Sequence, residues 1–371
     1  MSARSDLIGR SFADVPTPVA VVDSDALRSN VGLMARNLRA AGVDHRPHTK
    51  THKCREIAAL QLAAGAVGVT CATLGEAQAM ATVGLPANVL LARSLAADPA
   101  KVPVIAALAR DAHVTLVVDE TDQVEAIARA CRQAGSRVAL LVELDIGFGR
   151  AGCRSVDRLV EVARSIDRLD GVEFAGLMGY EAHAMGILGD QERHATVHGA
   201  LDRLAEAKAR CEAAGLGVRV VSAGGTITYL SVAEHPVVTE VRAGGYVFMH
   251  ATKRPAIPEL AGFRHALSVL STVIGSYPDG RVVLDAGVKS VSTDGGTALL
   301  VRGLEGATVA MATEEHLVLD VSGVERRPQT GERFEIVSTH SCTTANLHGR
   351  YLVRSGGSDT IADVWPVTAR Y

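Results

Sequence analysis

Apolar and polar positions repeat with two different periods along this chain of 371 residues. In the first two-thirds, short β-branched apolar runs such as "HVTLVVD" (113–119) alternate with longer stretches of helical period such as "ETDQVEAIARACRQAG" (120–135). This alternation is typical of βα units. After an opening strand at 19–23, strands are expected at residues 45–51, 66–73, 88–94, 113–119, 137–147, 174–180, 218–225 and 240–246. Helices are expected at residues 24–42, 54–65, 75–84, 98–111, 120–135, 155–166 and 190–215.

Eight strands with helices between them favour a (β/α)8 barrel of the TIM type, over residues 18–254. An open doubly wound sheet is disfavoured, because no glycine-rich phosphate fingerprint follows the first strand. Beyond this point the pattern changes to strands and turns, at residues 266–277, 281–287, 316–321, 332–342, 351–356 and 363–371. The sequence therefore predicts an all-β domain over residues 255–371, with the junction in "KRPAIPELAGF" (253–263) and residues 1–17 packing on this domain.

Composition and charge narrow the class of protein. The formal net charge is −3 and aromatic residues make up 4% of the chain, whereas a nucleic-acid-binding protein needs a basic stripe. No apolar run has the length of a signal-peptide core or a membrane span, so we expect a cytoplasmic protein with no membrane partner. Its cysteines are far apart and form no CxxC pair, which predicts free thiols at Cys54, Cys71, Cys131, Cys153, Cys211 and Cys342.

Chemically capable residues gather where barrel strands end, which is where active sites of this fold lie. Lys50, in "HRPHTKTHK" (45–53), follows the first barrel strand. An amine flanked there by Arg46, His48 and Lys53 would have a lowered pKa and is a candidate Schiff-base lysine. The alternative is an ordinary solvated surface lysine.

A glycine-rich stretch after the seventh barrel strand, "VSAGGTITY", could cradle a phosphate with backbone amides and hydroxyls. A plain glycine-rich turn is the alternative. The candidate residues are Ser222, Gly224, Gly225 and Thr226, joined by Gly245 and Tyr246 after the eighth strand. A reactive lysine and a phosphate cradle at one barrel mouth together indicate pyridoxal phosphate. Arg150 could then approach its pyridine nitrogen, or could form an ion pair at the barrel rim.

The β domain contains "VSTHSCTTANLH" (337–348). If this segment is a strand, His340 and Cys342 point to the same face and can share one metal ion, for which an imidazole with a thiolate favours zinc. Two protein ligands would leave coordination positions open for water and substrate. A lone H-x-C pattern is also common without a metal.

The chain resembles the D-threonine aldolase and D-serine dehydratase family over nearly its whole length. The resemblance rests on "TPVAVVD", "RPHTKTHK", "DIGFGRAG", "LMGYEAHAM", "SAGGTITY", "VRAGGYVFM", "VVLDAGVKSVSTD", "EEHLVL" and "HSCTT". It implies an alanine-racemase-like fold, pyridoxal phosphate on Lys50, and a divalent metal (Zn, Mn or Mg) on His340 and Cys342. It also implies a small D-3-hydroxy amino acid as substrate, and a homodimer.

Two lyase reactions follow from this resemblance. In retro-aldol cleavage, the main prediction, His183 removes the hydroxyl proton and Tyr180 stacks on or hydrogen-bonds the cofactor. In D-serine or D-3-hydroxyaspartate dehydration, Lys50 removes the Cα proton and the hydroxyl leaves. "GYEAH" and "SAGGTITY" resemble the aldolase branch, whereas H-x-C resembles the dehydratase branch. Further alternatives are an amino-acid racemase, for which Tyr277 and Tyr351 are the candidate second bases, and a non-enzymatic carrier of pyridoxal phosphate.

Overall fold

The computed structural model describes residues 6–83, 88–95, 98–251 and 257–369, and the chain divides into two compact units. The barrel unit comprises Met34–Lys50 and Ile57–Gly244, and the β unit comprises Met1–Leu33, Thr51–Glu56 and Gly245–Tyr371. The predicted domain boundary at 254 and 255 lies outside the described residues.

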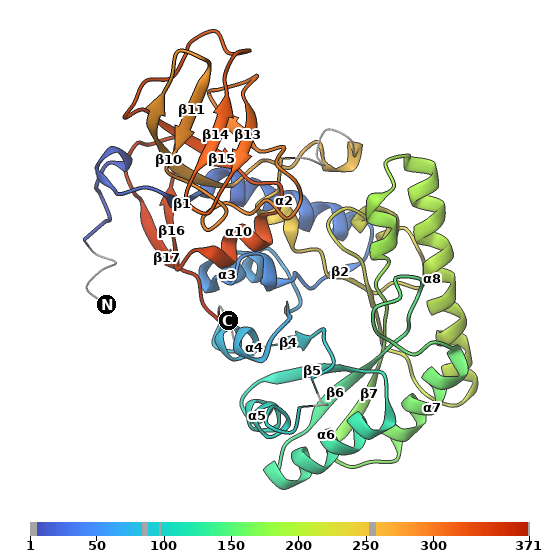
Figure 1. Cartoon of the computed structure of the whole chain (residues 1–371). Helices are drawn as coiled ribbons and strands as arrows, with labels where there is room; N and C mark the ends of the chain where they lie inside the picture. The colour runs from blue at the N-terminus through green and yellow to red at the C-terminus, as the bar shows by residue number, and fades with distance from the viewer. Residues whose placement is uncertain (1–5, 84–87, 96–97, 252–256, 370–371) are drawn as a thin grey trace. The chain divides into compact units, whose positions relative to one another are not determined.

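The barrel unit is built on one parallel sheet of eight strands (Figure 1). Its strands, in the order β2-β9-β8-β7-β6-β5-β4-β3, pair in parallel throughout. The sheet closes on itself, because His48 bridges Thr70 and the amide of Thr70 donates to the carbonyl of Pro47 at 2.8 Å. The predicted barrel is confirmed. The strands are β2 (Asp44–His45), β3 (Val69–Cys71), β4 (Asn88–Leu91), β5 (His113–Val118), β6 (Val138–Glu143), β7 (Val172–Met178), β8 (Val220–Ala223) and β9 (Glu240–Val241).

Helices follow most of these strands, for local reasons that the sequence contains. In α6, Val124, Ile127, Ala128 and Cys131 recur at helical spacing and are all buried, and Gly135 ends the helix in the left-handed conformation with φ 64°. The helices are α2 (Ser24–Ala40), α3 (Arg55–Ala63), α4 (Leu74–Met80), α5 (Val102–Leu108), α6 (Thr121–Ala134), α7 (Val156–Asp167), α8 (Asp190–Ala213) and α9 (Tyr229–Ala233). No helix in the described ranges is both long and apolar enough to cross a membrane.

The β unit is a mostly antiparallel sheet of nine strands. The opening strand β1 (Val19–Asp23), which the sequence analysis grouped with the barrel, belongs to this sheet and pairs with β10 and β16. Two short strands, β12 and β13, were not predicted. The remaining elements are β10 (Leu267–Ser276), β11 (Arg281–Leu284), β12 (Leu300–Arg302), β13 (Thr308–Ala312), β14 (Leu317–Asp320), β15 (Arg333–Val337), α10 (Ser341–Leu347), β16 (Arg350–Arg354) and β17 (Asp363–Pro366).

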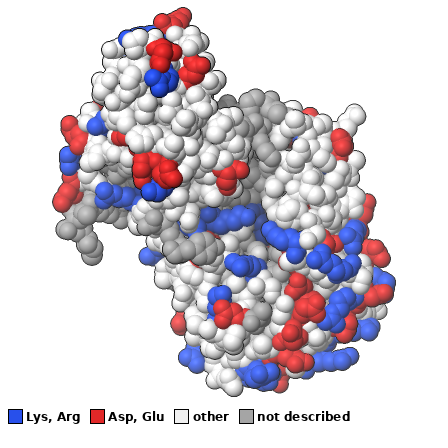
Figure 2. Space-filling model, viewed as in Figure 1, with Lys and Arg blue, Asp and Glu red and all other residues white. Residues whose placement is uncertain are grey.

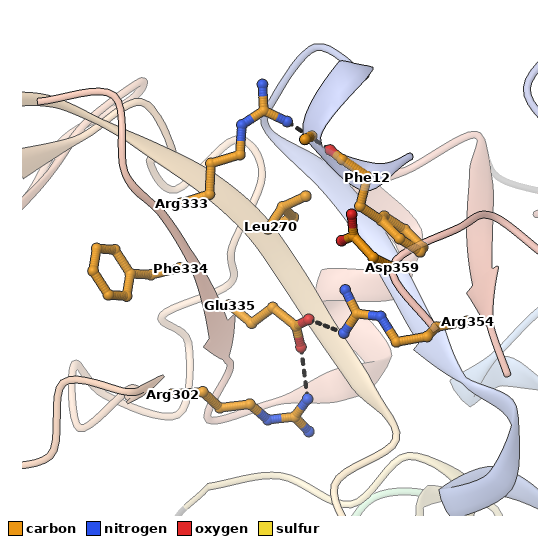
Figure 3. A pocket seen from close by; sticks show the side chains of 9 residues that line it. Phe12, Leu270, Arg302, Arg333, Phe334, Glu335, Arg354 and Asp359 are labelled. Atoms are coloured by element: carbon orange, nitrogen blue, oxygen red, sulfur yellow. Dashed lines mark hydrogen bonds and ion pairs between the residues drawn. The ribbon is translucent and has the colours of Figure 1, made fainter. Parts of the chain in front are cut away.

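The N-terminal residues complete a small apolar core in the β unit. Phe12 and Val15 pack with Val21, Leu270 and Leu352. Beside this core lies a cavity of about 450 Å³ in which Glu335 forms ion pairs with both Arg302 and Arg354 (Figure 3). One carboxylate is therefore shared by two of the guanidinium groups that line this cavity.

Charges of both signs are interspersed over the outer helices of the barrel unit (Figure 2). Arg158 pairs with Glu120, and Arg210 pairs with Asp157 at 2.6 Å. Basic and acidic side chains of this helical face therefore pair with one another. The six cysteines all lie in the described ranges, and none of them forms a disulfide, as predicted.

Candidate active site

Lys50 lies at the C-terminal end of β2, on the short 3-10 turn Thr49–Thr51. A hydrogen bond joins this turn to β3, because the buried Thr49 hydroxyl donates to the carbonyl of Thr70 at 3.0 Å. The side chain of His48 is half-buried, and its Nδ1 accepts the amide hydrogen of Lys50 at 3.4 Å. Lys50 itself is exposed. A rigid backbone thus presents a lysine at the strand end, as an amine that reacts with a ligand requires.

The loop after β6 brings His183 against a glycine. Gly147 has φ 123°, and a Cβ atom added there would lie 2.9 Å from Cε1 of His183. The loop is held by Asp145, whose Oδ1 accepts the amide hydrogens of Gly147 at 3.1 Å and Gly149 at 2.9 Å. His183 is exposed on the 3-10 turn Ala182–Gly186 after β7. The absence of a side chain at position 147 therefore leaves room for the imidazole.

Arg150, Tyr180 and Gly225 come together from three different strand ends. The guanidinium carbon of Arg150 lies 5.5 Å from the centre of the Tyr180 ring and 5.2 Å from that of Phe148. A Cβ atom added at Gly225 would lie 3.3 Å from the hydroxyl of Tyr180. The Arg150 guanidinium and the Tyr180 ring therefore lie beside a backbone segment that has no side chain at Gly225. This arrangement suits a flat anionic ligand.

The predicted phosphate-binding stretch already makes hydrogen bonds of its own. The Gly224 amide donates to Glu181 at 3.2 Å, and the Gly225 amide donates to the Thr228 hydroxyl at a long 3.3 Å. Ser222 is fully buried. Its hydroxyl donates to Glu240 at 2.7 Å. Thr226 is half-buried. Of this stretch, Gly225 and Thr226 are best suited to face a ligand.

Beneath this stretch lies a buried ionic network inside the barrel. Arg242 donates to the Ser222 hydroxyl at 2.7 Å and to the carbonyl of Gly179 at 2.8 Å. Burial lowers the pKa of Arg242, while the carboxylates of Glu181 and Glu240 raise it. Arg46, predicted as a cation beside Lys50, is buried and pairs with Glu240 at 2.8 Å. Its charge is therefore matched within the barrel.

Two further residues that were predicted to bind the cofactor, Gly245 and Tyr246, belong to the β unit. Gly245 begins a 3-10 turn, and Tyr246 is completely buried, with its ring 5.9 Å from Phe263 in an edge-to-face arrangement. The barrel residue before them, Gly244, has no room for a side chain, because an added Cβ would lie 2.4 Å from the carbonyl oxygen of His48.

His340 and Cys342 lie at the start of a helix, so their predicted placement on a strand is wrong. The strand β15 ends at Val337, His340 is the N-cap residue of α10, and Cys342 lies in its first turn. A hydrogen bond to Cys342, with further contributions from Asp294, raises the pKa of His340 to about 9. Nδ1 of His340 lies 2.7 Å from Oδ2 of Asp294, and the hydroxyl of Thr51 lies 3.2 Å from Sγ of Cys342. The two side chains meet despite the change of element.

Comparisons with known proteins agree with this architecture. The family described as "Alanine racemase, N-terminal domain" matches residues 22–252, and a serine dehydratase domain family matches residues 266–354. The 3-hydroxy-D-aspartate aldolase of Paracoccus denitrificans (strain Pd 1222) is 31% identical over 375 residues, covering 98% of this chain and 94% of that protein. The chain belongs to the D-threonine aldolase and D-serine dehydratase family. It is thus a pyridoxal-phosphate-dependent lyase with an alanine-racemase-like fold.

Both branches of this family are similar to the chain. The D-threo-3-hydroxyaspartate dehydratase of Delftia sp. (strain HT23) is 34% identical over 358 residues, covering 88% of this chain and 91% of that protein. The crystal structure of D-threonine aldolase from Filomicrobium marinum superposes with a TM-score of 0.90 at 32% identity, covering 98% of this chain and 97% of that one. Sequence similarity alone therefore leaves the reaction open within the family.

Several polar residues of this family member were missed by sequence reasoning. Arg242 lies two residues after Glu240 in an otherwise apolar and glycine-rich run, and nothing in its spacing indicates that it belongs to a buried network. Asp294 is 46 positions from His340 and meets it only through folding. A charged residue within a run that otherwise reads as a buried strand, such as Arg242, is the one signal that could have pointed to the network.

Proposed function

We propose that this lyase cleaves D-3-hydroxy amino acids of the D-threonine type between Cα and Cβ, giving glycine and an aldehyde. The observation that carries the proposal is the approach of His183 to Gly147 at the end of the barrel where Lys50 also lies, after β2. An exposed imidazole in this position is a base for a substrate hydroxyl.

The barrel residues fit pyridoxal phosphate. Lys50 provides the amine for its aldehyde, Arg150 and Tyr180 provide a cation and an aromatic face, and Gly225 leaves the backbone open. The long hydrogen bond from the Gly225 amide to Thr228 is one that a phosphate oxygen could replace. We place the phosphate at the Gly225 amide and the half-buried Thr226 rather than at Ser222, which is fully buried and whose hydroxyl donates to Glu240 and accepts from Arg242.

His340 and Cys342 fit a divalent metal, for which we propose Zn²⁺ or Mn²⁺. The carboxylate of Asp294 binds Nδ1 of His340, which leaves Nε2 as the ligand atom, an arrangement that orients metal-binding histidines in many proteins. Bound pyridoxal phosphate supplies an electron sink for the pair of electrons left on Cα, and the metal supplies positive charge that favours ionisation of a hydroxyl.

The residues of the chain have separate tasks in this reaction. Lys50 would hold the cofactor through its amine, and Arg150 and Tyr180 would orient the ring. His183 accepts the proton of the substrate 3-hydroxyl while the Cα–Cβ bond breaks, so that the hydroxyl oxygen becomes the aldehyde oxygen. A proton then returns to Cα, and glycine is released.

The dehydratase reaction is the second candidate, and the pairing of Cys342 with His340 favours it, because H-x-C resembles that branch. In this reaction Lys50 would remove the Cα proton and the hydroxyl would leave as water. A water molecule then hydrolyses the released enamine, through its imine form, to a 2-oxo acid and ammonia. A racemase is disfavoured. The hydroxyl of Tyr351 donates to the carbonyl of His52 at 2.7 Å and burial raises the pKa of Tyr351, so it is a poor second base.

The deciding experiment is to incubate the protein with pyridoxal phosphate and D-threonine, with Mn²⁺, with Zn²⁺ or with EDTA, and to identify the products. Glycine and acetaldehyde would support the aldolase proposal, whereas 2-oxobutanoate and ammonia would support the dehydratase. L-Threonine serves as the stereochemical control. Borohydride reduction followed by peptide mass spectrometry should locate the cofactor on Lys50, and the Lys50→Ala variant should lose both the label and turnover. No turnover of D-threonine or D-3-hydroxyaspartate with any metal would contradict the proposal.

From the same resemblance we propose that the protein is a homodimer. Light scattering after size-exclusion chromatography gives the mass directly. A mass near twice the 38.8 kDa of one chain is expected, and a single-chain mass at micromolar concentration would contradict this part of the proposal.

A further inference from the structure

Two histidines and a glutamate meet on the outside of the barrel unit, on elements that the proposed reaction does not use. His194 and His198 are four residues apart on α8, so they share one face of that helix, and Glu234 is the C-cap residue of α9. One potential ligand atom of each residue lies within 4.8 Å of those of the other two. Within the described ranges, this is the one cluster of three or more potential metal ligands.

The hydrogen bonds of the cluster leave a ring nitrogen of His198 with a lone pair that can bind a metal ion. Nε2 of His198 lies 3.0 Å from the carbonyl oxygen of Ser231. A carbonyl only accepts, so Nε2 carries the proton and Nδ1 of the neutral ring has a lone pair for a metal ion. Backbone carbonyls hold many metal-binding histidines in this way. Nε2 of His194 lies 3.1 Å from a carboxylate oxygen of Glu234, which shows that these two groups already converge.

The rings themselves are crowded together. The centres of the His194 and His198 rings are 4.0 Å apart with an angle of 26° between their planes, and His235 meets His198 edge-to-face at 5.1 Å. Side chains of His194 and Glu234 are 46% and 51% exposed, so an ion can enter from solvent.

The ion pair between His194 and Glu234 does not by itself explain why His198 also lies in this cluster. An exposed ion pair such as His194 with Glu234 contributes little to stability. It does not require a second imidazole stacked on the first. Two imidazoles and one carboxylate, with water as the fourth ligand, form a common tetrahedral zinc set.

We propose that His194, His198 and Glu234 form a Zn²⁺ site that joins α8 to the end of α9, separate from the pair His340 and Cys342. The site does not depend on the proposed reaction. Because α9 directly follows the segment 222–228, the bound ion would stabilise the connection between that segment and the long helix α8. Stabilisation follows by mass action, since the ion binds the folded state.

The test uses the full-length protein with His340→Ala and Cys342→Ala, which removes the other proposed ligands. Isothermal titration with Zn²⁺ should still give one binding event, and Zn²⁺ should raise the thermal unfolding temperature. Adding His194→Ala or Glu234→Gln to this background should weaken binding at least tenfold and abolish the thermal shift. His113→Ala, an exposed histidine at the start of β5, is the matched control and should leave both unchanged.

Circular dichroism without metal verifies that each variant is folded. His194 and Glu234 are about half-exposed, so their replacement leaves the core intact even if His198→Ala unfolds the protein. The proposal is overturned if the background protein binds no Zn²⁺, or if His194→Ala and Glu234→Gln bind it as tightly as the background does.

Discussion

Two glycines at the barrel mouth differ in how much space they leave for a side chain. Gly147 and Gly149 lie two residues apart, both with positive φ of 123° and 74°, and both donate to Asp145. An added Cβ would clash with His183 at Gly147, whereas it would meet nothing within 4 Å at Gly149. The two glycines therefore separate the effect of backbone strain from the effect on His183.

We expect Gly147→Ala to lower kcat/KM about tenfold or more, which corresponds to about 1.4 kcal/mol of transition-state stabilisation. Its Cβ must displace the imidazole proposed as the base. Gly149→Ala introduces similar left-handed strain and should retain most of the activity. Steady-state kinetics with D-threonine and thermal unfolding of both variants measure the difference. Equal losses in the two variants would mean that His183 is not positioned by this contact.

His45 makes stability depend on pH. It is buried in β2 with Nε2 3.2 Å from the carbonyl oxygen of Ala243. Burial lowers the pKa of His45 to about 4, although the Ala243 carbonyl and Glu240 raise it. Between this value and the ordinary value of about 6.5, the unfolded chain binds more protons than the folded one. Acid therefore favours unfolding over this range.

When the pH falls from 7 to 5, we expect proton binding by His45 in the unfolded chain to lower the free energy of unfolding by about 2 kcal/mol. His45→Gln keeps a donor for Ala243 but cannot titrate, so its loss over the same range should be smaller by that amount. Urea unfolding of both proteins at the two pH values measures this. Parallel pH dependences would show that His45 is not the group responsible.

At the scale of elements, helix starts in the barrel depend on local caps. The hydroxyl of Thr73 accepts the amide hydrogen of Glu76 at 3.2 Å at the start of α4. The carboxylate of Glu76 in turn accepts the amide hydrogen of Ala72 at 2.7 Å. This reciprocal arrangement is close to a capping box, and it fixes how the chain turns from β3 into α4.

Thr73→Ala should lower the free energy of unfolding by about 1 kcal/mol, because an amide at the helix start loses its acceptor. Thr73→Ser keeps the hydroxyl and should cost much less. Chemical denaturation of the two variants and the parent gives the values. A Ser variant as unstable as the Ala variant would assign the loss to the methyl group of Thr73 rather than to the cap.

At the scale of the whole molecule, the chain passes between the two units several times. The β unit includes Met1–Leu33 and Thr51–Glu56 as well as the C-terminal part, so the chain leaves the barrel unit and returns to it. β1 has its partners in β10 and β16, about 250 and 330 residues later. Cutting the chain at the predicted boundary would leave β1 with two unpaired edges.

A fragment of residues 18–254 should therefore aggregate or unfold at a clearly lower temperature than the full chain, because exposed strand edges pair with other molecules. A fragment of residues 34–244, which lacks β1, should aggregate less. Light scattering and thermal unfolding followed by circular dichroism compare the three proteins. A monomeric 18–254 fragment that unfolds within a few degrees of the full chain would contradict this expectation.

The local order of polar and apolar residues determined the number and type of the barrel elements. Period and glycine placement are local properties, so the eight strands and most of their helices could be predicted, whereas the roles of the residues at the strand ends stay predictions. The same reasoning failed for His340 and Cys342, because a two-residue alternation over a short segment does not distinguish a strand end from a helix start. Only the tertiary structure assigned β1 to the β unit, buried Arg242 among carboxylates, paired Asp294 with His340 and joined His194, His198 and Glu234. Each of these depends on residues that are distant in sequence and are brought together by strand pairing or by the packing of loops and helices, which no local pattern encodes.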